Sequence, residues 1–350
     1  MLELREISKR FGSFSLKEVS FTVMPGDYFI LLGESGAGKS LVLEAIAGLV
    51  EPDSGAILHD GRDITRDKIQ DRGTGMVFQD HAIFPHLTVA ENLSYSLHGR
   101  PSGRKEKQAK VSAIAGELGI SELLGRKPGT LSGGELQRVA LGRTLIQEPG
   151  ILLLDEPLSS LDTSLKKELR RLLRSIHGRG KTILHVTHDY EEALSLATRI
   201  AVIGEGRIIQ WGTPAEVLHH PKSEFIARFA GISNFFPARL LRKDSACHAV
   251  IGGGNSLRLL TEEPEGEGYV LIRGEDILLS SAPVETSASN HFTGKVTEIV
   301  PARGGMEVTF DAGMELHALI TPESAEKLHL LPGTECHIHV KAAAVKFINR

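Results

Sequence analysis

The sequence predicts an α/β domain with a parallel sheet over residues 1–235, followed by a small all-β domain over residues 236–350. The first prediction depends on two observations: wholly apolar runs alternate with amphipathic helical patterns, and one of these runs ends in a glycine-rich turn. The second depends on a change after about residue 236, where helical periodicity fades and Gly, Pro, Ser and Glu separate short apolar runs. A chain of 350 residues is long enough for both domains to bury a core.

In the first domain each predicted element follows from its local pattern. Residues 19–23 alternate between apolar and polar, which is typical of a half-buried strand. A helix is expected from about Gly38, and another over residues 162–177, where four leucines and an isoleucine form one stripe. Residues 200–211 contain a Gly-Glu-Gly turn between two apolar runs and predict a hairpin. Buried strands are expected at three continuous apolar runs: residues 28–32, 151–154 and 182–186.

In the second domain the short apolar runs predict strands of a sandwich or barrel. Residues 284–289 are expected to link two lobes of this domain. The strands are predicted at residues 269–272, 277–279, 295–300, 307–310 and 337–340.

The composition is that of a globular protein and excludes several classes. Lys and Arg number 40 against 44 Asp and Glu, and the net charge of −4 argues against a nucleic-acid partner, which favours clustered positive charge. Cys247 and Cys336 are far apart in the sequence, which excludes a disulfide framework and disfavours a zinc site. No apolar run approaches the length of a membrane span, and the N-terminus is charged where a signal peptide is apolar. Any membrane role is therefore expected to need a partner.

A glycine-rich loop predicts a phosphate site. Residues 33–40 fit the pattern G-x-x-x-x-G-K-[ST] between a predicted strand and a predicted helix, a context that disfavours a chance glycine-rich turn. In such a loop the backbone N–H groups and the helix N-terminus surround phosphate oxygens. Lys39 would reach the β- and γ-phosphates of ATP, and the Ser40 hydroxyl would bind Mg²⁺. The other nucleotide-binding residues expected here are Gly33, Ser35, Gly36, Ala37 and Gly38.

A second candidate element is the apolar strand that ends in Asp155 and Glu156. Acidic residues often end strands, so this pattern alone predicts little. It becomes informative because the glycine-rich loop accompanies it. Asp155 is expected to bind Mg²⁺, usually through water, and Glu156 is expected to act as the general base on the attacking water. Together the two elements predict the fold of a P-loop NTPase.

Residues 131–138, Leu-Ser-Gly-Gly-Glu-Leu-Gln-Arg, resemble the signature sequence of ATP-binding cassette (ABC) ATPases. Four further positions resemble motifs of that family in its order. Phe11 stands where an aromatic stacks on adenine, Gln79 in the Q-loop, residues 159–162 in the D-loop and His188 at the switch histidine. The resemblance covers about residues 1–235 and implies an ABC cassette with a helical subdomain.

The resemblance also implies roles for these residues. Gln79 would sense Mg²⁺ and the attacking water, and His188 would contact the γ-phosphate and orient Glu156. The signature loop would face ATP held by a second copy, so the protein would act as a homodimer. The signature and D-loop residues implied to contact that nucleotide are Ser132, Gly133, Gly134 and Asp162.

Residues 84–92 resemble importer ATPases that dock on separate membrane subunits. This implies a peripheral protein at the cytoplasmic face of the membrane, with integral-membrane permease subunits and, indirectly, a periplasmic or extracellular substrate-binding protein as partners. ABC proteins of DNA repair or translation usually carry two cassettes or a coiled-coil insertion, and this sequence has neither. A nucleotide-gated scaffold with little turnover is the other class considered, and the presence of both Glu156 and His188 disfavours it.

Residues 287–348 resemble the molybdate-binding β-domain (TOBE or Mop-like) of molybdate and tungstate importer ATPases. That implies an OB-like regulatory domain and import of molybdate or tungstate. Ser289 replaces a frequent Arg, and residues 342–344 lack a frequent Ser, so a β-domain that only dimerises the subunits stays an alternative. Sulfate, ferric-ion, polyamine and sugar importers share such a tail and are the close alternatives. The residues implied to bind the oxyanion are Ser287, Thr321, Ser324 and Lys341.

Overall fold

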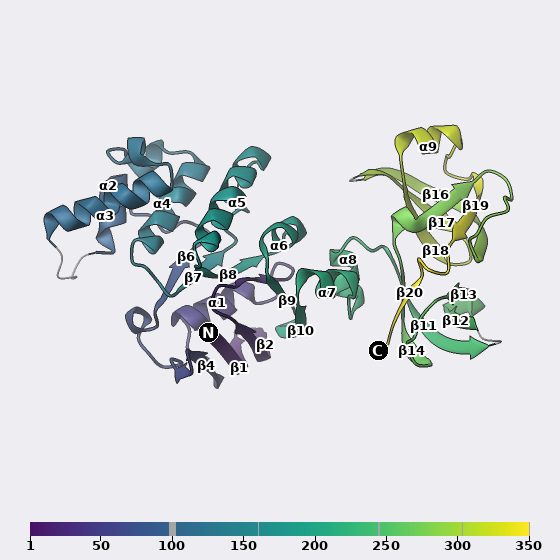
Figure 1. The fold of residues 1–350 in the computed structure, drawn as a ribbon, viewed down its shortest axis with the longest axis horizontal. Helices are drawn as coiled ribbons and strands as arrows, with labels where there is room; N and C mark the ends of the chain where they lie inside the picture. The colour runs from purple at the N-terminus through teal and green to yellow at the C-terminus, as the bar shows by residue number, and fades with distance from the viewer. Residues whose placement is uncertain (98–102, 160, 244–245, 303, 350) are drawn as a thin grey trace. The chain divides into compact units, whose positions relative to one another are not determined.

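The computed structural model describes residues 1–97, 103–159, 161–243, 246–302 and 304–349 (Figure 1). The chain divides into two units, Met1–Val217 and Leu218–Arg350. This division lies before residue 235, where the pattern of apolar runs changes. The reason is that α8 (Glu224–Phe229) contacts β11 (Asn234–Lys243) and therefore belongs to the second unit. Each unit is described by itself.

A six-stranded sheet is the centre of the first unit, with the strand order β10-β9-β3-β8-β7-β6. The pairs β3·β8, β3·β9, β7·β8 and β6·β7 are parallel, and β9·β10 is an antiparallel hairpin. Every residue of β3, β7 and β8 is buried, as the continuous apolar runs predict for strands covered on both faces. The strands are β3 (Tyr28–Leu32), β6 (Thr74–Val77), β7 (Ile151–Asp155), β8 (Thr182–Thr187), β9 (Arg199–Gly204) and β10 (Arg207–Gly212).

A second sheet of four antiparallel strands has the order β2-β1-β4-β5. One apolar core joins residues of β1 and β2 with α1 (Lys39–Ala47) and with β3 and β7. Helix α1 is therefore held by both sheets, which fixes the loop that precedes it. Residues 19–23 form a strand as expected, but in this separate sheet. Its strands are β1 (Leu2–Phe11), β2 (Phe14–Val23), β4 (Ser54–His59) and β5 (Arg62–Asp63).

Three helices pack on one another beside the parallel sheet and form the helical part of the first unit (Figure 1). They are α2 (Val89–Tyr95), α3 (Arg104–Glu117) and α4 (Gly133–Leu145). Both α2 and α4 begin with a capping box, in which a hydroxyl and a glutamate satisfy backbone N–H groups reciprocally. The remaining helices of this unit are α5 (Thr163–Gly178), which confirms the predicted stripe, and α6 (Tyr190–Leu196). The division between the two units falls within α7 (Pro214–His219).

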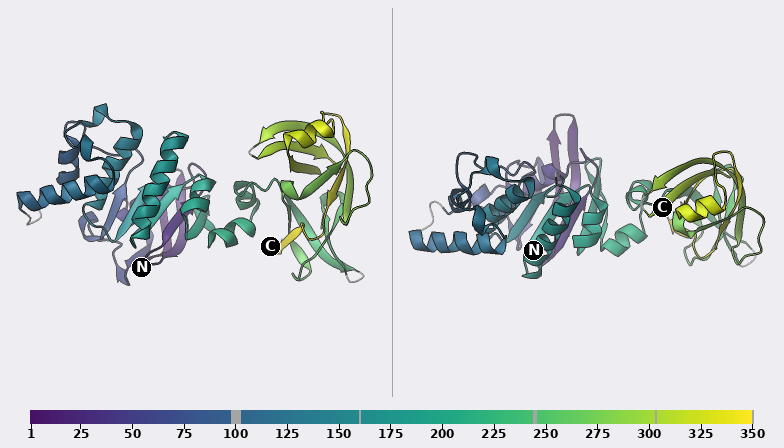
Figure 2. Two further views of the ribbon diagram at one scale, coloured as in Figure 1. Left: turned by 45° about the horizontal axis from the view of Figure 1, so that its top comes forward. Right: turned by 90° about the horizontal axis from the view of Figure 1, so that it is seen from above.

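The second unit consists mainly of two five-stranded antiparallel sheets, with orders β13-β12-β11-β14-β20 and β15-β19-β16-β17-β18 (Figure 2). Leu240 and Val270 of the first sheet share one core with Phe310 and Ile338 of the second. The all-β prediction is confirmed. Besides β11, the elements are β12 (Ala246–Ile251), β13 (Ser256–Leu259), β14 (Gly266–Ile272), β15 (Ile277–Ser280), β16 (Asn290–Ala302), β17 (Gly305–Asp311), β18 (Glu315–Ile320), α9 (Pro322–Lys327), β19 (Glu335–Val340) and β20 (Lys346–Asn349).

The expectation that residues 284–289 link two lobes is wrong. This segment connects β15 to β16, and both strands belong to the same sheet, where each pairs with β19. The C-terminal strand β20 instead returns to the first sheet and pairs with β14. These pairings join residues far apart in the sequence, so the spacing of apolar runs carries no sign of them.

We expect Phe310→Ala to destabilise the second unit by about 3–5 kcal/mol, because it empties a fully buried aromatic site in the shared core. The measurement is the unfolding transition of that unit in denaturant. Leu331→Ala is the control: Leu331 is 68% exposed, and the change is expected to stay within about 0.5 kcal/mol. Equal effects of the two substitutions would contradict the assigned core.

Candidate active site

The loop of residues 33–38 joins the end of β3 to the start of α1. Gly38 has φ +100°, and a Cβ there would lie 2.7 Å from side-chain atoms of both Phe14 and Leu16. At Gly33 a Cβ would lie 2.5 Å from the carbonyl oxygen of Ile203. Both positions therefore require glycine, one for its left-handed backbone and both for close packing. Ser35 and Gly36 are exposed and Ala37 is buried, so the turn of the loop faces solvent.

Lys39 is buried at the base of this loop with a side-chain exposure of 5%. Its Nζ donates to the carbonyl oxygens of Gly33 and Glu34, both at 2.9 Å, and lies 3.5 Å from Glu156 Oε1. The ammonium group is thus held between the loop and the end of β7. A cation fixed there stabilises negative charge at the mouth of the loop.

Ser40 and Asp155 form a set of oxygen donors that fits a magnesium ion. Ser40 Oγ donates to Asp155 Oδ1 at 2.9 Å. Burial raises the pKa of Asp155, although the Ser40 hydrogen bond opposes this; the charge of Glu156 adds to the rise, and Lys39 and His185 act against it. A buried carboxylate beside a hydroxyl is the environment in which a hard divalent cation is favourable. Gln79 lies in an exposed turn after β6, and no hydrogen bond joins it to Ser40 or Asp155 in the described residues.

Glu156 connects this cation-binding edge to His188. Glu156 Oε2 lies 3.2 Å from His188 Nδ1, so the two carboxylate oxygens face the imidazole and the Lys39 ammonium respectively. The Glu156 backbone has φ +42°, the left-handed region that costs free energy for a residue with a side chain. Its N–H donates to the carbonyl oxygen of Val186 at 3.0 Å, which ties the turn to β8.

The signature and D-loop residues lie on helix starts. Ser132 is the N-cap of α4: its hydroxyl accepts from the N–H of Glu135, and the Glu135 carboxylate accepts from the N–H of Ser132. The N–H groups of Gly133 and Gly134 have no acceptor inside a helix. Ser132 and Gly133 are exposed, whereas Gly134 is buried against Leu165.

Asp162 is the N-cap of α5 and accepts from the N–H groups of Ser164 and Leu165. Phe11 ends β1, pairs with Phe14 across the hairpin and is 63% exposed. Ser160, another D-loop residue, lies outside the described residues. The structure therefore brings five predicted residues to one edge of the parallel sheet, and Phe11, Gln79, Ser132 and Asp162 lie on other elements. The five are Lys39, Ser40, Asp155, Glu156 and His188.

The four predicted oxyanion residues fall into two groups within one chain. Thr321 caps α9, and its hydroxyl lies 2.9 Å from the Ser324 hydroxyl. These two follow β18, which pairs through β17 with the end of β16 near Ala302. Ser287 precedes the start of β16, and Lys341 follows β19, which pairs with that start. Ser287, Thr321 and Lys341 are exposed.

Glu192 is not among the residues predicted from the sequence; its carboxylate lies on α6 with 2% exposure, 3.3 Å from His185. The helical spacing of the sequence gives a weak signal for this residue. Glu192 lies next to Ala193 and four residues before Leu196, the two buried apolar residues of this short helix, so it shares their face. An acidic residue on a buried helix face needs a partner, which only the folded chain identifies.

Two family models match the chain: the ABC transporter model over residues 16–159 and the TOBE domain model over residues 286–347. The molybdate/tungstate import ATP-binding protein WtpC of Pyrococcus abyssi is 40% identical over 349 residues, which cover 99% of each chain. The chain belongs to the ATP-binding proteins of ABC importers. It is therefore an ATPase subunit of that class. The sulfate/thiosulfate import ATP-binding protein CysA 2 of Chromobacterium violaceum is 39% identical and covers 99% of this chain and 94% of the relative.

Two solved ABC structures resemble the first unit. One is a dimeric post-hydrolysis state of the cassette MJ0796 bound to ADP and Pi, with a TM-score of 0.55, 28% identity, and coverage of 61% of this chain and 99% of that one. The other is cbiO1 of Clostridium perfringens, part of the ABC transporter complex cbiONQ, with a TM-score of 0.58, 30% identity, and coverage of 63% and 90%. Both confirm the cassette fold predicted from the motifs.

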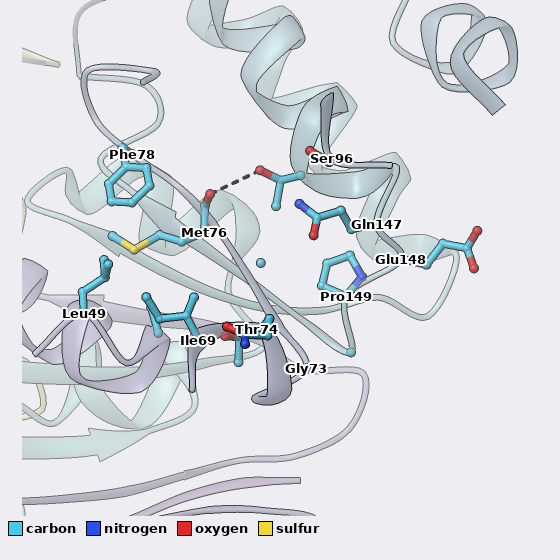
Figure 3. A pocket seen from close by; sticks show the side chains of 15 residues that line it. Leu49, Ile69, Gly73, Thr74, Met76, Phe78, Ser96, Gln147, Glu148 and Pro149 are labelled. Carbon is cyan, nitrogen blue, oxygen red and sulfur yellow. Dashed lines mark hydrogen bonds between the residues drawn. The ribbon is translucent and has the colours of Figure 1, made fainter. Parts of the chain in front are cut away.

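A cleft of about 770 Å³ lies in this ABC cassette beside the Q-loop (Figure 3). It opens next to Phe78, the residue before Gln79, and Thr144 of α4 donates to the Met76 carbonyl oxygen at 3.2 Å across it. Its lining combines polar residues with five apolar ones: Leu49, Ile69, Met76, Phe78 and Pro149. In the described part of the chain, no helix combines the length and apolarity that crossing a membrane requires.

We expect Gly38→Ala to weaken ATP binding about tenfold or more, because the left-handed backbone alone costs ~1–2 kcal/mol and the new Cβ displaces Phe14 and Leu16. The measurement is equilibrium binding of ATP. Gly26→Ala is the matched control: Gly26 has φ +79° but no atom within 4 Å of the added Cβ. It is expected to lower stability and leave ATP affinity unchanged, and a similar loss of affinity in both variants would contradict the packing argument.

Proposed function

We propose that this ATPase hydrolyses MgATP with Glu156 as general base and that two copies form the complete site. The observation that carries the proposal is the position of the Glu156 carboxylate between Lys39 Nζ and His188 Nδ1, at 3.5 and 3.2 Å. A base so placed can accept a proton from a water molecule that lies near the phosphate end of the loop. His188 orients the carboxylate and donates to the γ-phosphate, and Lys39 binds the β- and γ-phosphates.

Ser40 and Asp155 would hold Mg²⁺, with Gln79 approaching from the Q-loop. The bound ion would neutralise charge on the phosphate oxygens. The loop N–H groups at Gly33, Ser35, Gly36, Ala37 and Gly38 would surround the same oxygens, and Phe11 would stack on adenine. The exposed edge of Phe11 supports this last role, because an aromatic in solvent is free to contact a planar base.

A homodimer would complete the site from the opposite side. The exposed start of α4 presents the N–H groups of Gly133 and Gly134, which attract an anion together with the helix dipole. Ser132 and Asp162 would join them at the nucleotide of the partner. The dimeric MJ0796 structure with ADP and Pi supports this arrangement, since that cassette resembles the first unit.

A scaffold with little turnover is the second class of function. The Glu156–His188 contact disfavours it, because a carboxylate held in a strained backbone conformation against a histidine serves no purpose in simple binding.

We expect Glu156→Gln to lower ATP hydrolysis by about 10²–10⁴-fold, because the amide cannot accept the proton. ATP binding should persist, and the ATP-bound dimer should accumulate. Phosphate release and size-exclusion chromatography with ATP are the measurements, with Glu122→Gln on the surface as the control. Full hydrolysis in Glu156→Gln would remove the general-base role.

The cleft beside Phe78 supports docking of integral-membrane permease subunits. A short helix of each permease subunit would bind in this cleft. In the proposed assembly the protein is a peripheral subunit at the cytoplasmic face of the membrane, with a periplasmic or extracellular substrate-binding protein as an indirect partner. The presence of the related cbiO1 in the cbiONQ transporter complex supports such an assembly.

Molybdate or tungstate is the proposed transported substrate, with the C-terminal domain as an intracellular sensor. The WtpC relative and the resemblance of residues 287–348 support this. Sulfate is the alternative that a specific observation favours, because the CysA 2 relative is nearly as similar. Ser287, Thr321, Ser324 and Lys341 would bind the oxyanion by hydroxyl donors and one cation. Their separation into two groups within one chain means that a complete set would need a second copy.

Titration of the full-length protein with molybdate, tungstate and sulfate tests the sensor. We expect heat with molybdate or tungstate, and about a tenfold or greater loss of affinity in Lys341→Gln, since a charge-assisted hydrogen bond is lost. Lys346→Gln removes an equally exposed lysine from β20 and is the matched control. Binding of sulfate alone would favour the alternative substrate, and no heat with any oxyanion would remove the sensor.

A further inference from the structure

A chain of buried polar side chains lies on β3 and on the two elements that flank His188, β8 and α6. Tyr28 OH lies 3.1 Å from His185 Nδ1, and His185 Nε2 lies 3.3 Å from Glu192 Oε2. All three side chains are nearly inaccessible, with exposures of 0% for Tyr28 and His185 and 2% for Glu192. They come from β3, β8 and α6, so the chain crosses from the centre of the parallel sheet to the helix that follows His188.

Glu192 reaches the backbone around His188 through Thr187. The Thr187 hydroxyl lies close enough to the Glu192 carboxylate to lower its pKa as a donor, and the hydroxyl oxygen accepts from the N–H of Asp189 at 3.0 Å. The hydroxyl thus bridges the residues on either side of His188. Because a hydroxyl has one proton, donation to Glu192 directs its lone pairs toward the Asp189 N–H.

The local charges keep Glu192 ionised in spite of its burial. Burial raises its pKa, but the adjacent His185 and Thr187 side chains, with the charges of His185 and Lys166, outweigh this and lower the pKa overall. Lys166 of α5 also lies 3.8 Å from Asp189 Oδ2. An ionised acceptor holds the Thr187 hydroxyl more strongly than a neutral one does.

Glu192 touches none of the groups placed at the reacting phosphate. Its carboxylate lies against His185 and Thr187, and it caps no helix end, since Asp189 fills that position by accepting from the N–H groups of Glu191 and Glu192. A carboxylate buried at this cost needs a reason beyond local helix formation.

We propose that Glu192 is a positioning residue for ATP hydrolysis: through the Thr187 hydroxyl it fixes the turn that carries His188, and His185 with Tyr28 fixes Glu192 from below. This rests on the proposed role of His188 at the γ-phosphate. His188 itself is half exposed, so its 3.2 Å contact with Glu156 depends on the backbone that carries it. A shift of the order of 1 Å in such a contact costs about a hundredfold in rate.

The test compares Glu192→Gln with Glu191→Gln in the full-length protein. Glu191 precedes Glu192 on α6 and lies 3.8 Å from Arg170, so its substitution removes the same charge without touching Thr187. We expect Glu192→Gln to lower kcat between about tenfold and a hundredfold with KM for ATP unchanged, and Glu191→Gln to keep both. Loss of stability with an unchanged kcat per folded molecule would overturn the proposal.

A second pair covers the case in which Glu192→Gln does not fold. Thr187→Val removes the bridging hydroxyl at nearly the same volume, and Thr187→Ser keeps it. We expect Val to lower kcat as Glu192→Gln does and Ser to restore it. Equal rates for Val and Ser would overturn the proposal.

Single-turnover hydrolysis in a His188→Ala background completes the test. If Glu192 acts through His188, adding Thr187→Val to His188→Ala lowers the rate no further, whereas independent effects would multiply. Multiplied effects overturn the positioning role and leave the proposed function standing. A His188→Ala variant as fast as the unmodified protein would instead overturn the proposed function itself.

Discussion

The contact of the Glu156 carboxylate with Lys39 and His188 is the interaction on which the proposed active site depends. Each of these residues follows a different strand, and the three strands β3, β8 and β7 are neighbours in the parallel sheet. Their carboxyl ends therefore lie at one edge, which is where ligands bind in open α/β sheets. The chemistry depends on a sheet whose strands are buried on both faces and held in one register.

The glycine-rich loop is also constrained by close packing, in addition to the register of the strands. Gly38 packs on Phe14 and Leu16 of the antiparallel sheet, and Gly33 packs on the carbonyl of Ile203 in the parallel sheet. The loop is thus held between the two sheets that share the α1 core. A phosphate-binding loop held in this way keeps its N–H groups in place before a ligand arrives, and preorganisation of this kind lowers the cost of binding.

In the second unit the core and the polar residues considered for binding lie in different places. Its two sheets enclose one apolar core, and the C-terminal strand β20 returns to the sheet that begins the unit. Polar residues implied to bind an anion remain on its surface at two ends of β16. A unit built in this way separates its stability, which depends on the core, from the proposed anion binding, which would depend on exposed side chains.

The sequence by itself determined the elements that are local. The loop of residues 33–40, the acidic end of β7, the amphipathic stripe of α5 and the buried strands were all readable, because each depends on residues close together in the chain. The ATPase family followed from the order of these motifs.

The tertiary structure alone decided what depends on distant pairing. The separate antiparallel sheet, the return of β20, the two groups of oxyanion residues and the place of residues 284–289 within one sheet all come from strand pairings between remote segments. Glu192 illustrates the same limit within the active site. Its burial against His185 requires β8 and α6 to pack together, and the helical spacing that puts Glu192 on the buried face of α6 does not identify this partner.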